Sequence, residues 1–169
     1  MTTFRNWVFL GLLVCAASAC DLNAQTSPPS NLDAYDVPVI TEAEFASLAK
    51  TACEKAAGKK KVLLEFSAPW CGDCKGLHAM KQVGSLKKEL AEWEVLVLNI
   101  GKFEHHDALL KHFKLKAIAD WRVLDPPKDC SQPLISWPVV SQRTLEPLSG
   151  KPVSVSALSS WLKTIRSKK

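Results

Sequence analysis

The sequence lacks a hydrophobic run long enough to cross a membrane. Its main apolar stretch, Val8–Ala19, stops before Asp21, short of the roughly 18 residues that a transmembrane helix needs. It also lacks a basic stripe interleaved with aromatic residues, because the net charge of +5 comes largely from short lysine runs such as Lys59–Lys61. These absences argue against a membrane-spanning protein and against nucleic-acid binding. The length of 169 residues predicts a single compact domain, and no internal repeat is visible.

The amino-terminal segment has the plan of a secretory signal peptide over residues 1–19. Arg5 precedes the apolar stretch, and Ala17-Ser18-Ala19 supplies the small residues of a cleavage site. Cys20 follows at once, which resembles the lipobox of bacterial lipoproteins, where the cysteine is lipidated. Ala17 stands where that box usually has leucine, and ordinary cleavage also fits. We expect an exported protein on the periplasmic side of a membrane as a lipoprotein, or a soluble periplasmic protein.

Residues 20–40 are expected to be a lipid anchor and flexible tether, because Gln25–Pro38 is rich in Ser, Pro and Asn and poor in apolar residues. The folded domain is expected over residues 41–169. Thr41 and Glu44 form a capping box, and apolar residues then recur at helical spacing until Gly58.

The rest of the chain alternates between strand and helix patterns. We predict strands at 62–66, 95–100, 121–124 and 138–141, and helices at 72–91, 107–113 and 155–165. This order predicts an α/β fold in which helices flank both faces of a mixed central β-sheet.

Cys71-Gly72-Asp73-Cys74 joins the end of a predicted buried strand to the start of a helix. Helix amides and the positive end of the helix dipole stabilise a thiolate there, so Cys71 is the expected nucleophile. Cys74 lies one turn along and can resolve a mixed disulfide. A structural zinc site is disfavoured because there is no second such motif, and His105 and His106 are adjacent rather than spaced as ligands.

The segment Ala68–Lys75 resembles the active site of the thioredoxin superfamily, in particular that of bacterial exported thioredoxin-like proteins. The resemblance implies a thioredoxin fold and a cofactor-free thiol-disulfide oxidoreductase that acts on protein thiols and disulfides or on a redox partner domain. It assigns Glu65, six residues before Cys71, as the buried acid that takes the proton from Cys74. A glutamate facing solvent is the alternative. Val97 replaces a lysine that often assists this acid.

The resemblance also implies that Trp70 contacts substrate and that a cis-proline faces the disulfide. We expect Pro138, preceded by Trp137, to be that proline, which requires an insertion of about twenty residues before it. The rival alignment makes 121–124 the strand and places Ala119 at the proline position.

Cys53 and Cys130 leave three possibilities open: a structural disulfide, two independent thiols, or an electron relay through an exposed Cys130.

Two functions other than disulfide exchange also remain. Thiolates suit Cu(I), so a copper-binding or copper-delivering protein of thioredoxin fold is the main alternative. A redox-silent interaction module is the other. If the protein is an oxidoreductase, we expect a reductant, because an ionised Asp73 repels the Cys71 thiolate and favours the disulfide.

Overall fold

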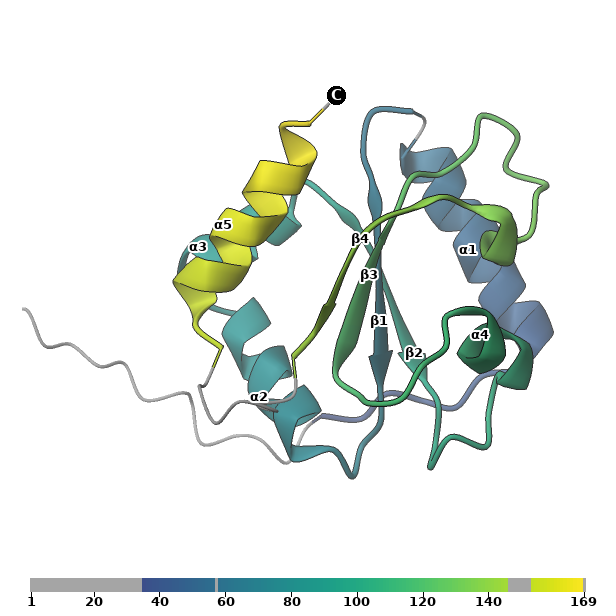
Figure 1. The fold of residues 1–169 in the computed structure, drawn as a ribbon, viewed down its shortest axis with the longest axis horizontal. Helices are drawn as coiled ribbons and strands as arrows, with labels where there is room; N and C mark the ends of the chain where they lie inside the picture. The colour runs from purple at the N-terminus through teal and green to yellow at the C-terminus, as the bar shows by residue number, and fades with distance from the viewer. Residues whose placement is uncertain (1–34, 57, 146–152, 169) are drawn as a thin grey trace, which may run out of the picture.

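The computed structural model describes residues 35–56, 58–145 and 153–168, and these residues are built around a four-stranded sheet (Figure 1). The strands are β1 (Val62–Ser67), β2 (Glu94–Asn99), β3 (Asp120–Leu124) and β4 (Val139–Thr144). Their order across the sheet is β2-β1-β3-β4. β1 runs parallel to β2, and β3 is antiparallel to both β1 and β4. The predicted mixed sheet is confirmed.

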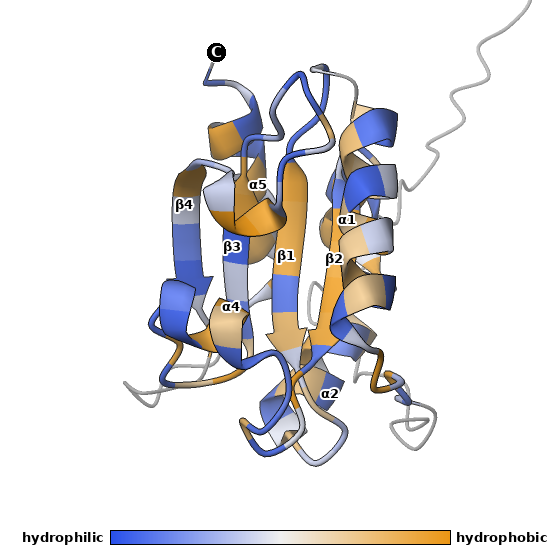
Figure 2. Cartoon of the chain, turned by 90° about the vertical axis from the view of Figure 1, so that its right-hand side faces the viewer, coloured by the Kyte–Doolittle hydropathy of each residue, from blue (hydrophilic) through white to orange (hydrophobic). Residues whose placement is uncertain are grey.

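Helices cover both faces of this sheet (Figures 1 and 2). They are α1 (Glu42–Ala56), α2 (Gly72–Lys81), α3 (Gly84–Leu90), α4 (Asp107–His112) and α5 (Val155–Arg166). One face carries α1 and α4, and the other carries α2, α3 and α5. No helix within the described ranges is long and apolar enough to span a membrane. The α/β architecture agrees with the prediction from the alternating pattern.

β1 forms the centre of the core, and all six of its residues are buried. A central strand that is covered on both faces reads as a nearly continuous apolar run, and β1 does so except at Glu65 and at its last residue, Ser67. β4 contrasts with it, because it is an edge strand, largely hydrophilic, whose residues are exposed or half-buried (Figure 2). The position of Glu65 in the best-covered strand therefore needs a specific explanation.

The predicted helix over 72–91 is in fact two helices. Val83 is extended, with φ of −126°, and Gly84 has φ of +58°. A β-branched residue followed by a glycine in the left-handed region interrupts the helix at this point. The capping box at the start of α1 is confirmed, because the Thr41 amide donates to Glu44 Oε2 at 2.7 Å and the Glu44 amide donates to Thr41 Oγ1 at 3.2 Å.

The ordered part of the domain begins before the expected boundary at Thr41. Tyr35 is only 6% exposed and belongs to the hydrophobic core, and Val37 and Ile40 pack against that core. The Asn99 side-chain amide donates to the Val37 carbonyl at 2.6 Å. These contacts place residues 35–40 with the domain rather than with the tether. The expected signal peptide and Cys20 lie outside the described residues.

Candidate active site

Cys71 and Cys74 form a disulfide at the point where β1 leads into α2, with their Cα atoms 5.2 Å apart. Cys71 is the N-cap of α2, and its Sγ accepts a hydrogen bond from the Cys74 amide at 3.0 Å. Cys71 is 5% exposed and Cys74 is wholly buried. An amide at a helix N-terminus that points at one sulfur stabilises negative charge there, so this geometry favours Cys71 as the attacking thiolate.

Glu65 lies on β1 and is completely buried, which rules out the solvent-facing alternative. Its Oε2 accepts hydrogen bonds from the Lys81 ammonium at 2.7 Å and from the Trp121 indole nitrogen at 3.0 Å. Its Oε1 has no hydrogen-bond partner within the described part of the chain. A buried carboxylate normally requires full pairing. Here one oxygen is paired and the other is free to accept a proton.

The lysine beside Glu65 comes from an unexpected element. Val97 of β2 lies directly across from Glu65, so the strand position that often carries lysine in the family is apolar. Lys81, at the end of α2, supplies the cation instead, and its side chain is only 10% exposed. The sequence analysis missed Lys81. A signal for Lys81 was present in the sequence: it lies at the end of the helix that contains Cys74, and a helix that follows a strand packs back along that strand, here the one that carries Glu65.

Trp70 is 53% exposed directly before Cys71, as expected for a residue that contacts substrate. Its indole nitrogen donates to the Gly101 carbonyl at 2.8 Å, which ties the redox turn to the loop after β2. Gly101 has φ of +57°, and a Cβ atom there would lie 2.6 Å from Glu104 Oε1. The loop that positions Trp70 is therefore tightly constrained at Gly101.

The expected roles of Trp137 and Pro138 in substrate binding are wrong. Trp137 is 3% exposed, and its indole nitrogen donates to the Gln132 carbonyl within the loop between β3 and β4. The Pro138 carbonyl accepts from the Asp125 amide just after β3 ends. β3 runs antiparallel to β1, and Leu124 at the end of β3 pairs with Val62 at the start of β1. Pro138 therefore lies at the opposite end of the strands from Cys71, which follows the last residue of β1.

The rival alignment is the correct one. Asp120 pairs with Phe66 near the end of β1. Ala119 therefore lies at the same end of the strands as the turn that carries Cys71 and Cys74. The peptide bond between Ile118 and Ala119 is cis. Ala119 thus occupies the position that the family gives to proline. The residues expected to be an insertion form the loop between Leu124 at the end of β3 and Val139 at the start of β4, so they follow the strand that pairs with β1 rather than precede it.

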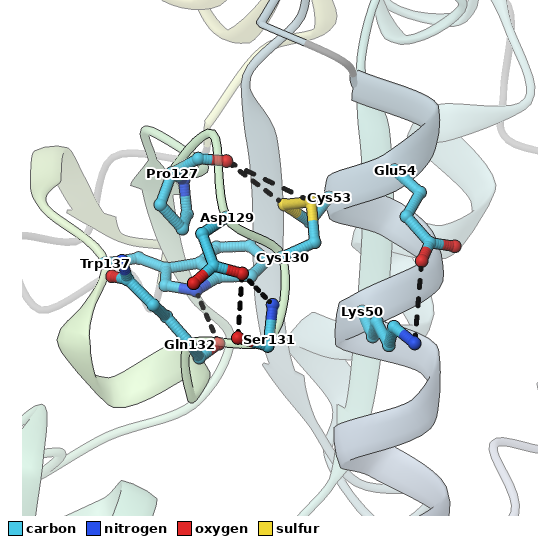
Figure 3. The surroundings of a disulfide bond; sticks show 9 residues. All are labelled: Lys50, Cys53, Glu54, Pro127, Asp129, Cys130, Ser131, Gln132 and Trp137. Atoms are coloured by element: carbon cyan, nitrogen blue, oxygen red, sulfur yellow. Dashed lines mark hydrogen bonds and ion pairs between the residues drawn. A yellow bond between two sulfur atoms is a disulfide. The ribbon is translucent and has the colours of Figure 1, made fainter.

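Cys53 and Cys130 form a disulfide with a Cα–Cα distance of 5.6 Å (Figure 3). It joins α1 to the loop between β3 and β4, and both of its sulfurs lie close to the Pro127 carbonyl oxygen, at 3.3 and 4.0 Å. Cys53 is 1% exposed. Of the three possibilities for this pair, the structure contains the bridge.

A cavity of about 570 Å³ lies between α1, α4 and the loop that the disulfide holds. Its walls include Phe45, Leu109, Cys130 and Leu134, and they do not include the Cys71–Cys74 pair. The redox pair therefore lies outside this cavity.

His105 and His106 do not join the cysteines. His106 precedes α4 with φ of 62°, is 5% exposed and packs edge-on against Phe45 at 5.6 Å. Burial lowers the pKa of His106. The nearby Ile40 backbone offsets part of this decrease in pKa. Neither ring nitrogen of His106 forms a hydrogen bond of normal geometry with the described residues. Those residues contain no group of three or more His, Cys, Asp or Glu arranged to hold a metal.

A βαβ unit followed by an antiparallel strand pair, with two cysteines at the first strand-to-helix turn, defines the class of thioredoxin-fold thiol-disulfide oxidoreductases. The model of the thioredoxin family matches residues 36–125, and the chain belongs to this family. The matched range includes β1, both cysteines, Glu65 and β3. The chain matches no curated protein.

The fold agrees with that of a solved structure. A disulphide isomerase from Xylella fastidiosa Temecula1 is 19% identical with a TM-score of 0.59, covering 78% of this chain and 98% of its own. A thioredoxin from Thermus thermophilus is 15% identical with a TM-score of 0.47, covering 77% of this chain and 85% of its own. At these identities the likeness concerns the fold, so a specific activity has to be argued from the site.

Proposed function

We propose that the chain reduces disulfide bonds of protein substrates through Cys71 and Cys74 in the bacterial envelope. The observation that carries this proposal is the Cys71 sulfur at the N-terminus of α2, bonded to the Cys74 amide, with the buried Glu65 on the adjoining strand. This arrangement supplies a stabilised nucleophile, a resolving thiol and a base without any cofactor.

The reaction proceeds in two exchanges. The Cys71 thiolate attacks one sulfur of the substrate disulfide, forms a mixed disulfide and releases the other substrate sulfur as a thiolate. Cys74 then loses its proton and attacks Cys71, which closes the Cys71–Cys74 bond and releases the second substrate thiolate. Two electrons pass from the dithiol to the substrate.

Glu65 is proposed as the base for the second exchange. Cys74 is wholly buried and has no access to solvent for its proton. Lys81 and Trp121 hold Oε2 of Glu65, which leaves Oε1 as the atom that accepts the proton. The Lys81 ammonium keeps a buried charge paired between turnovers.

The direction of electron flow follows from the residues between the cysteines. Asp73 is exposed in the first turn of α2, close to Cys71, and its negative charge raises the cost of a thiolate there. A strong oxidant needs a stabilised thiolate, so we expect a midpoint nearer the roughly −270 mV of thioredoxin than the roughly −120 mV of the strongest oxidant. Equilibration with glutathione buffers, followed by alkylation of free thiols, measures this midpoint.

Asp73→His should raise the midpoint because it removes the repelling charge. Asp107→His is the matched control: it makes the same change at the start of α4, where the aspartate pairs with Lys111. A wild-type midpoint above roughly −180 mV would reverse the assigned direction. An unmoved midpoint in Asp73→His would remove the charge argument.

The proposed location is the periplasmic side of a membrane, with Cys20 acylated. It rests on the sequence before Tyr35. Mature protein should partition into detergent, and Cys20→Ala should release it or leave it unprocessed. A mature N-terminus with an unmodified Cys20 would contradict the lipoprotein proposal and would leave the soluble periplasmic alternative.

A further inference from the structure

Tyr35 packs against the redox site although it precedes the first helix. Its hydroxyl shares a hydrogen bond with the hydroxyl of Ser67, the last residue of β1, which is wholly buried. Its ring lies 4.9 Å from the ring of His78 in α2. His78 is one turn beyond Cys74 on the same side of that helix. Tyr35 therefore contacts both elements that carry the redox chemistry.

The hydroxyl pair continues the polar row that begins at Glu65. Residues two apart on a strand face the same way, so Ser67 and Glu65 share one face of β1, with Ser67 nearer to the redox turn. Burial raises the pKa of Tyr35 to about 12, and the charge of Glu65 adds to the increase. Tyr35 is thus within electrostatic reach of Glu65, and its hydroxyl stays neutral near pH 7.

A route for protons is needed at this place. Glu65 and Cys74 are both 0% exposed, so a proton that passes from the thiol to the carboxylate cannot go directly to water. The side chains of Lys81 and Trp121 are donors and already bind Oε2 of Glu65. A hydroxyl can accept one proton while it donates another, and Ser67 and Tyr35 provide two of them.

The segment that carries Tyr35 is anchored rather than loosely laid on the surface. The Val37 carbonyl accepts from the Asn99 side chain at 2.6 Å, and Asn99 Oδ1 accepts from the Gly101 amide at 2.9 Å. Gly101 in turn accepts from Trp70, beside Cys71. These hydrogen bonds therefore fix the position of the segment that carries Tyr35 relative to the turn that carries Cys71 and Cys74.

We propose that Tyr35 is a positioning residue of the redox site, whose hydroxyl, held by Ser67, passes the proton between Glu65 and solvent. The inference rests on the proposed function. In the resolving step, Cys74 gives its proton to Glu65, and its sulfur forms the bond to Cys71 as the bond to the substrate sulfur breaks. The substrate leaves as a thiolate. Oε1 of Glu65 is not hydrogen-bonded to Ser67 in the oxidised structure, so the protonated carboxyl turns toward Ser67 before the proton leaves through the two hydroxyls.

Tyr35→Phe tests the proposal because it keeps the ring and removes only the hydroxyl. In single turnover, resolution of the mixed disulfide should slow about tenfold near pH 7, while the first attack by Cys71 keeps its rate. The deficit should shrink at higher pH and with added imidazole buffer, since both offer another acceptor. Ser67→Ala should slow the same step, and the double variant should be no slower than the slower single variant.

Two control variants complete the experiment. Ser159→Ala removes a hydroxyl on α5 that donates a hydrogen bond to the Ser85 carbonyl. It should leave the rate of resolution of the mixed disulfide unchanged. His78→Gln separates the contribution of the imidazole ring that lies 4.9 Å from the Tyr35 ring from that of the Lys81 ammonium bonded to Glu65. The pH dependence of the Tyr35→Phe deficit should persist in the His78→Gln background.

A wild-type rate of resolution in Tyr35→Phe at every pH would overturn the inference. So would a uniform slowing that neither pH nor imidazole changes, because that is the behaviour of a structural defect. Both outcomes are judged against wild-type protein, which must itself form and resolve mixed disulfides. If wild-type protein does neither, the proposed function itself has failed, which is a distinguishable result.

Discussion

Cys71→Ser is expected to abolish disulfide exchange, with a loss on the order of a thousandfold or more, whereas Cys74→Ser should accumulate mixed disulfides with substrate. The reason is the asymmetry of the pair: the Cys71 sulfur accepts a hydrogen bond from the Cys74 amide and Cys71 is 5% exposed, while Cys74 is wholly buried. Only Cys74→Ser keeps the attacking thiolate and loses its resolver. Reduction of a disulfide-bonded test protein with dithiothreitol as electron source measures the first effect, and non-reducing gels after alkylation show the second.

The Cys53→Ser/Cys130→Ser double variant is the control, since it removes the other disulfide-bonded pair of cysteines. Its exchange rate should stay near that of the wild type, because these sulfurs lie at a separate site between α1 and the β3–β4 loop. Full activity in Cys71→Ser would exclude the proposed enzyme. Trapping that depends on Cys130 would move the reactive thiol to the second disulfide.

Loss of the Cys53–Cys130 disulfide is expected to cost about 4.5 kcal/mol of unfolding free energy. The bridge joins residues 77 apart in sequence, and the stabilisation by a cross-link grows with the loop that it closes. Chemical denaturation of the double variant, with the wild type kept oxidised, measures the difference. The midpoint of thermal unfolding should fall by roughly 10–15 °C.

A second comparison separates the cross-link from the packing around it. Leu134 and Trp137 are buried in the same loop and remain in the double variant. We therefore expect the loop to stay on the core and the Cys71–Cys74 midpoint to be unchanged. A loss below about 1 kcal/mol would mean that the unfolded chain is constrained in other ways.

The fold and the redox pair could be predicted because short-range patterns determine them. The capping box at Thr41, the apolar run of β1 and the spacing of Cys71 and Cys74 each depend on a few neighbouring residues. The break at Val83 and Gly84 was missed because the helical spacing of apolar residues continues across it. Periodicity shows which face of a segment is apolar, but it does not show an interruption of one residue.

The errors in the site concern residues that are distant in sequence. Pro138 was chosen for its residue type, and the pairing of β3 with β1 excludes it by placing Ala119 at the redox edge. Lys81 and Tyr35 were missed because their partners, Glu65 and Ser67, are defined only once α2 and the 35–40 segment are placed on the sheet. Long-range pairing of this kind leaves no local pattern.

The two disulfides are nested, because the Cys71–Cys74 pair lies inside the span from Cys53 to Cys130. A chain that is delivered from its N-terminus into an oxidising compartment presents Cys53, Cys71 and Cys74 before Cys130 has arrived. The first oxidation available to Cys53 is then a non-native one, with either of the reactive cysteines. Formation of the long-range bridge must wait for the β3–β4 loop, and it requires any premature partner of Cys53 to be exchanged away. On such a route, maturation of this domain needs either a Cys53 that stays reduced until that loop arrives or a disulfide exchange that frees it.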